Sequence, residues 1–186
     1  DEEVTQELSF HNELVIQTVC RSNDLRVSSR VEMIPNKSGA PYLEIGITAD
    51  AGDDGWLIAA VRPYNPEGVQ FVDEIRVDDD LPGFIVNGKT SVRFGRKPVQ
   101  VRMAHYEDGD VYLDLTTDYH QSSIRCDAGM ATAAAMFPMT SGIPCDLRIH
   151  IPLDEEVRSR DLKLNNQDRT WPAVTEGLAK LDVDDE

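Results

Sequence analysis

The sequence predicts an all-β protein, a two-sheet antiparallel sandwich followed by one C-terminal amphipathic helix. Three observations support this fold class. Apolar residues alternate with polar ones through much of the chain, which is typical of half-buried strands. Clusters of Gly, Pro, Asn and Asp separate the alternating runs. About ten such runs at short spacing favour two packed antiparallel sheets.

The alternating runs define the expected strands in chain order. They cover residues 25–33, 43–47, 69–77, 84–86, 92–94, 99–103, 111–115 and 147–151. Asn87-Gly88 predicts a type I′ hairpin, because Asn and Gly tolerate positive φ. The run 56–61 alternates less, and we interpret it as a central strand covered on both faces, with Trp56 in the core. His150 follows the polar positions of its strand and is expected to face solvent.

Two segments depart from strand alternation. The alanines of residues 129–137 favour a helix, yet the run is short, ends at Pro138 and lies between strands, so its type stays open. Near the C-terminus, apolar residues recur at helical spacing: Trp171, Val174, Leu178 and Leu181. We therefore expect a β-sandwich domain over residues 1–153, a charged linker over 154–169 and a connector helix over 170–182.

Composition limits the classes of partner and the compartment. The chain has 34 acidic and 18 basic residues, a net charge of -16, which disfavours nucleic acid and anionic membranes as partners. No apolar run approaches the length needed to span a bilayer, so we expect a soluble protein, and we assign it to the cytoplasm. The three cysteines are expected to be reduced and buried, although a bridge between Cys126 and Cys145 stays open.

The chain lacks the motifs of a catalytic or cofactor site. Neither the aspartates at 50, 53 and 54 nor Asp78–Asp80 follow the EF-hand order, and we interpret them as turn residues rather than metal ligands. The four histidines have no metal-binding spacing, and no nucleophile elbow or phosphate loop occurs. We expect no cofactor and no metal. A small hydrolase with dispersed carboxylates is the least supported alternative.

The segment Arg62–Gly68, Arg-Pro-Tyr-Asn-Pro-Glu-Gly, follows an apolar strand. This strand and turn resemble those in the N-terminal domain of bacterial amylo-α-1,6-glucosidases and related glycogen-debranching-type proteins. Residues 127–139 resemble a Gly-led, Ala-rich strand of that domain, and 147–153 resemble its closing strand. The resemblance covers about residues 15–181, with little similarity at 154–169. It favours a strand for the alanine-rich segment.

In such glucosidases the catalytic carboxylates lie in a helical (α/α) toroid, so the resemblance implies no catalytic residue in this chain. It implies instead a noncatalytic domain that packs against the helical catalytic domain of the same protein. The expected interdomain contacts are Arg62, Tyr64, Asn65, Glu67 and Trp171. A local role for the turn, in which Arg62 and Glu67 bond only to their own domain, stays open.

The alternative function is a free-standing carbohydrate-binding or protein-interaction module. Tyr64 lies in a Pro-bracketed loop, and Tyr112 alternates out of phase with its apolar neighbours, so both are expected on the surface. Exposed aromatic rings can stack on sugars. The resemblance to debranching-type glucosidases implies an α-glucan as the ligand of such a module.

Overall fold

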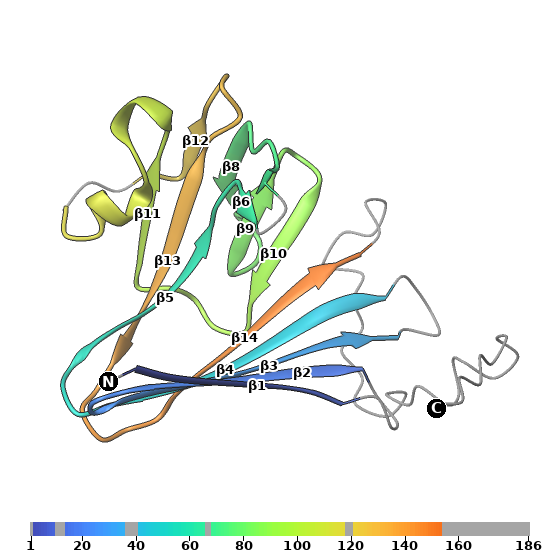
Figure 1. Cartoon of the computed structure of the whole chain (residues 1–186). Coiled ribbons are helices and arrows are strands. Elements are labelled where there is room, and N and C mark those ends of the chain that lie inside the picture. The colour runs from blue at the N-terminus through green and yellow to red at the C-terminus, as the bar shows by residue number, and fades with distance from the viewer. Residues whose placement is uncertain (1, 10–13, 36–40, 66–67, 118–120, 154–186) are drawn as a thin grey trace, which may run out of the picture.

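A computed structural model of the chain describes residues 2–9, 14–35, 41–65, 68–117 and 121–153, and it is all-β (Figure 1). Two short 3₁₀ helices, η1 (Tyr106–Asp108) and η2 (Val111–Asp114), follow the eleventh strand. The strands are β1 (Glu2–Ser9), β2 (Val15–Ser22), β3 (Leu25–Ile34), β4 (Tyr42–Ala51), β5 (Gly55–Val61), β6 (Tyr64–Asn65), β7 (Gly68–Val69), β8 (Glu74–Val77), β9 (Gly83–Val86), β10 (Thr90–Phe94), β11 (Gln100–Ala104), β12 (Ser123–Arg125), β13 (Thr132–Met139) and β14 (Cys145–Pro152). The predicted linker 154–169 and connector helix 170–182 lie outside the described residues.

Two antiparallel sheets confirm the predicted architecture. The large sheet has nine strands in the order β1-β2-β3-β4-β14-β10-β9-β8-β12, and the small sheet has three in the order β11-β13-β5. In Figure 1 the small sheet lies over the half of the large sheet that runs from β14 to β12. In Figure 1 the strands β1 to β3 extend beyond the small sheet, although Val27 of β3 still packs against a cluster that includes Met139 of β13.

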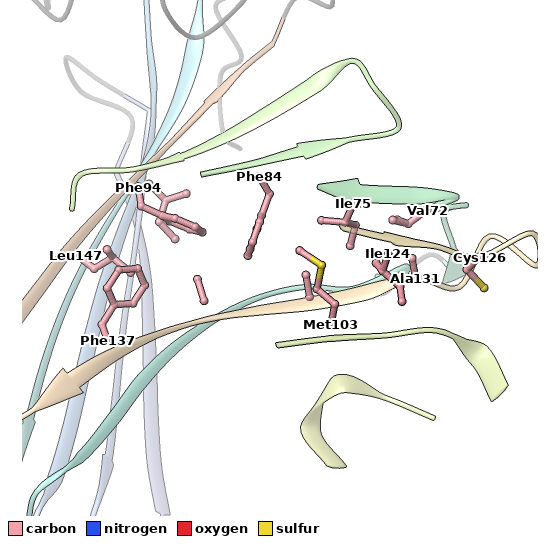
Figure 2. Close-up of a cluster of buried hydrophobic side chains, with 13 residues drawn as sticks. Val72, Ile75, Phe84, Phe94, Met103, Ile124, Cys126, Ala131, Phe137 and Leu147 are labelled. Carbon is pink, nitrogen blue, oxygen red and sulfur yellow. The ribbon is translucent and has the colours of Figure 1, made fainter. Parts of the chain in front are cut away.

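The main core fills the space between the small sheet and the β14-to-β12 half of the large sheet. Phe84, Phe94 and Phe137 come from β9, β10 and β13 and are almost fully buried. Their rings contact edge to face, with centroids 5.4 and 5.5 Å apart (Figure 2). Such contacts add to the free energy that burial of the rings already provides.

The hairpin between β9 and β10 has the predicted type of turn. Asn87 and Gly88 both have positive φ, of 51° and 68°, as a type I′ turn requires. The Asn87 side chain also fixes the preceding segment: its Oδ1 accepts from the amides of Asp73 and Glu74 at 2.8 and 3.1 Å. Its Nδ2 donates to the carbonyl of Phe71 at 3.0 Å. One residue thus shapes a turn and anchors a second stretch of chain.

The alanine-rich segment forms β13, the central strand of the small sheet. Ala133 and Ala135 pack into the main core, whereas Ala134 faces the other way and contacts Val111 of η2. All three alanines are fully buried. Small side chains suit this strand because it is covered on both faces.

The central position predicted for residues 56–61 is wrong. These residues do form a strand, β5, but it is an edge strand of the small sheet. Leu57 and Ala59 pack against the core, while Trp56 and Ile58 point outward and are 41% and 36% exposed. The alternation was masked in the sequence because the outward positions are also apolar.

The strand predicted at 111–115 is also wrong, because Val111–Asp114 forms the 3₁₀ helix η2. Asp110 caps the helix by accepting from the amide of Tyr112 at 2.9 Å. The amide of Val111 donates to Thr132 Oγ1 at 3.1 Å. One local partner and one distant partner thus replace the ladder bonds that a strand would have needed.

His150 does not face solvent as predicted, since it is only 5% exposed. Its Nε2 lies 2.9 Å from Glu44 Oε2, which belongs to the cross-strand partner in β4. The ring of Tyr42 meets the imidazole edge-on, with centroids 5.6 Å apart. Alternation placed His150 on the correct face of the strand, but it could not show that this face is covered.

The three cysteines are free thiols, and Cys126 and Cys145 are buried. Burial was thus predicted correctly for Cys126 and Cys145 but not for Cys20, which is half-buried, and Cys126 and Cys145 are not bridged to each other in the structure. The pKa of Cys126 is lowered, chiefly because the backbone amide of Tyr106 hydrogen-bonds to its sulfur. In the described part of the chain, no helix has the length and apolarity needed to cross a bilayer.

Candidate binding surfaces

The segment that carries the family resemblance forms a small hairpin. Tyr64–Asn65 (β6) pairs antiparallel with Gly68–Val69 (β7), and the amide of Gln70 donates to the carbonyl of Pro63 at 2.8 Å. Gly68 has a φ of 132°, a conformation that residues with a side chain rarely adopt. Of the predicted interdomain contacts, Glu67 and Trp171 lie outside the described residues.

Arg62 connects this hairpin to η2. Its Nη2 lies 2.7 Å from Asp110 Oδ1, the same oxygen that accepts from the Tyr112 amide. The structure thereby brings the two predicted sugar-contacting residues onto adjoining segments. Tyr64 is 51% exposed and Tyr112 is 68% exposed, as expected of surface residues. Arg62 has a carboxylate partner within its own domain.

A pocket of about 370 Å³ lies on the outer face of the small sheet. Its residues come from β5, β11, β13 and the segment after η2, and they include Trp56, Ile58, Gln100, Arg102, Thr116 and Met136. Arg102 is only 3% exposed and donates to Gln100 Oε1 at 2.8 Å. The sequence prediction missed this pocket because it assigned Trp56 to the core. Because the four residues Trp56–Ala59 are all apolar, the sequence does not indicate which of them face outward.

The third surface is the apolar side of the strands that extend beyond the small sheet. Residues paired across a ladder share a face, and successive residues alternate between faces. Leu8, Ile16, Val31 and Ile45 are aligned in this way from β1 to β4. A second row consists of Val4, Cys20, Val27 and Ala49. We call these two rows, with Leu25, Met33 and Leu43, the β1–β4 apolar face.

The opposite side of the same strands is mostly polar, and its apolar residues include Val15 and Val19. It carries Glu3, Glu7, Gln17, Arg21, Arg26, Ser28, Arg30 and Glu32. The two sides therefore differ as the inner and outer faces of a sandwich sheet do. Along the apolar side, Ile45 and Ile47 contact the main core, so this face continues the core outward.

The small sheet reaches the inner end of this face, where Val27 of β3 packs against the cluster that contains Met139 of β13. Val4, Leu8, Ile16 and Leu25 are nevertheless 57%, 47%, 39% and 43% exposed. The strands β1 and β2 were not predicted because Gln6 and Thr18 interrupt their apolar positions on this face. In the sequence, Val4 and Leu8 are four residues apart, as are Ile16 and Cys20. This even spacing, which puts each pair on one face of a strand, was the indication of these strands.

Acidic residues considered as metal ligands serve the turns. Asp54 Oδ1 accepts from the amide of Ser141 at 2.8 Å, and Asp78 Oδ1 accepts from the amide of Asp80 at 3.0 Å. Across the ranges that the structure describes, no three His, Cys, Asp or Glu side chains gather closely enough to hold a metal ion.

The sequence matches no protein-family model, and no curated protein matches it either. The resemblance to debranching-type glucosidases thus stays a prediction from the sequence.

Proposed function

We propose that this chain is a noncatalytic β-sandwich domain of a debranching-type, glucosidase-like protein, and that it docks on a helical catalytic domain of that protein. The observation that carries the proposal is the β1–β4 apolar face. An exposed apolar face that continues a core marks a surface that another protein layer covers. The substrate belongs to the helical domain, and no catalytic residue is assigned to this chain.

The dimensions of the face suit such docking. Strands of about eight residues, with roughly 3.3 Å per residue and about 4.8 Å between strands, give a face of roughly 500 Å². A stable interface buries about 800 Å² per partner, so the face would provide the larger, apolar part of such an interface.

The predicted contact residues of the hairpin would form a second, smaller part of the interface. The ion pair between Arg62 and Asp110 holds the hairpin against η2, so Tyr64 is presented from a fixed backbone. A rigid contact element loses less conformational entropy on docking than a flexible one. Asn65 lies in β6, beside Tyr64, whereas Glu67 and Trp171 extend the proposal beyond the described residues.

A cytoplasmic location is also part of the proposal. The free thiols of Cys126 and Cys145 support it, because buried thiols persist in reducing compartments. A helical domain encoded downstream would be made in the same compartment.

The test uses the product of the complete gene. Sequencing past the codon for Glu186 should reveal a reading frame with helical periodicity. Docking couples the domains, so Ile16→Lys should lower the calorimetric midpoint of the complete protein or split its transition. Gln17→Lys, one position along on the polar face, is the matched control and should change neither. A stop codon at 187, or equal effects of both variants, would refute the proposal.

A free-standing carbohydrate-binding module is the second candidate. Its support is that Asp110 binds both segments: it pairs with Arg62, which precedes Tyr64, and it accepts from the amide of Tyr112. Titration with maltooligosaccharides tests it by calorimetry. Loss of binding in Tyr64→Ala and Tyr112→Ala variants would favour this candidate, and absence of heat at millimolar sugar would remove it.

A further inference from the structure

We propose that the pocket beside Trp56 binds one pyranose ring of a neutral oligosaccharide. This site is distinct from the β1–β4 apolar face and does not depend on docking of a helical domain. It also differs from the surface predicted at Tyr64 and Tyr112.

The indole of Trp56 supplies an apolar wall. Trp56 and Ile58 project from the outer face of β5 and are 41% and 36% exposed, beside the buried Met136. A large aromatic ring left open beside a pocket binds ligands that have a flat apolar face. Because β5 pairs along its whole length with β13, the backbone that carries Trp56 is held in place.

The other wall provides polar groups. Arg102 Nη2 donates to Gln100 Oε1, and Arg102 Nη1 donates to the carbonyl of Val101 at 3.0 Å. These bonds fix the orientation of the Gln100 carboxamide, and its Nε2 donates to no described residue. Thr116 adds an exposed hydroxyl, which both donates and accepts. Oriented amide and hydroxyl groups facing an aromatic wall match a ring that has C–H groups on its face and hydroxyls on its edge.

The size and charge of the site select among ligands with an apolar face. A volume of about 370 Å³ is at the lower end of small-ligand pockets, which suits a single ring with its substituents. The net charge of -16 disfavours nucleic-acid bases carried on a phosphate backbone. A neutral pyranose satisfies both walls, so an oligosaccharide is the ligand class that the pocket fits.

The experiment uses Trp56 as its own probe. The chain has two tryptophans, so Trp171→Phe leaves Trp56 as the single indole. We expect maltohexaose, cellohexaose or xylohexaose to change the Trp56 fluorescence saturably at millimolar concentration. Saturation-transfer NMR on the unmodified chain should show contact with the ring protons of the same sugar.

Variants separate stacking from hydrogen bonding. Trp56→Ala should abolish the NMR signal, and Gln100→Ala should weaken binding by about fivefold, as expected for one lost hydrogen bond. Phe71→Ala removes another exposed aromatic ring outside the pocket and should leave binding unchanged. Circular dichroism checks that each variant is folded.

Binding that survives Trp56→Ala would overturn the proposal, as would the absence of binding by all three hexasaccharides. If Trp56→Ala does not fold, Trp56→Phe should retain weakened binding, and unchanged affinity in that variant would count against stacking. None of these outcomes depends on the docking proposed for β1–β4.

Discussion

Asn87 contributes to the fold in two ways, through the positive φ of its turn and through the hydrogen bonds of its side chain. Substitutions can remove the second contribution while keeping the first. Asn87→Gly retains the positive φ that the turn needs but removes the bonds to Phe71, Asp73 and Glu74. We expect a loss of about 1–2 kcal/mol in unfolding free energy, since water replaces part of these exposed hydrogen bonds.

Asn87→Ala should cost about 1–2 kcal/mol more than Asn87→Gly, because alanine is strained at this φ. Urea unfolding measures both variants. A glycine variant as stable as the natural chain would show that the side-chain bonds contribute nothing.

The buried pair of Glu44 and His150 is a second determinant at the residue scale. Glu44→Leu removes the carboxylate beside a buried imidazole, and we expect it to destabilise the fold by about 3 kcal/mol. Adding His150→Leu should restore part of that stability, because the double variant no longer contains a buried imidazole without its carboxylate partner. A double-mutant cycle by chemical unfolding measures the coupling. Strictly additive losses would contradict an energetic link between the two side chains.

At the scale of elements, η2 depends on a single carboxylate. Asp110 caps the helix and pairs with Arg62, so Asp110→Ala removes both interactions. We expect a loss of about 1–2 kcal/mol, mostly from the cap, because the Arg62 ion pair is partly exposed and screened by solvent. Hydrogen exchange should become faster at 111–114 and at 64–65. Arg62→Ala, which removes the ion pair but keeps the cap, should have the smaller effect.

Several elements were predictable because their patterns come from local physics. The turn at Asn87-Gly88 needs positive φ, and the alternation of 25–33 and 147–151 reflects two different environments. By contrast, Val111–Asp114 alternates like a strand but becomes helical. Its deciding bond, from Val111 to Thr132, joins positions far apart in the chain.

The candidate surfaces were predictable only in part, for a similar reason. Exposure of Tyr64 followed from loop composition. Tyr112 is exposed as predicted, but strand phase is not the reason, because its segment is helical and the neighbouring Leu113 is 67% exposed as well. The Trp56 pocket depends on which strand takes the centre of the small sheet, and the identity of that strand follows from packing rather than from alternation. The composition of β5 and β13 does not indicate which of the two is the central strand of the small sheet.

At the scale of the whole molecule, the sandwich covers only part of its larger sheet. The core accounts for the β14-to-β12 half, while β1–β3 carry an apolar face that the described part of the chain leaves partly open. A sheet with one apolar side is stable when another layer covers that side. The central claim is that this layer is a helical domain of the same protein.

Residue-level footprinting with a carbene reagent tests that claim most directly. Labelling of Leu8, Ile16 and Leu25 would be compared between the 186-residue chain and the product of the complete gene. Phe71, an exposed ring outside this face, serves as the internal reference. The account predicts that labelling of the three face residues falls several-fold in the complete protein, while that of Phe71 stays unchanged. Equal labelling of the three residues in both proteins would contradict it.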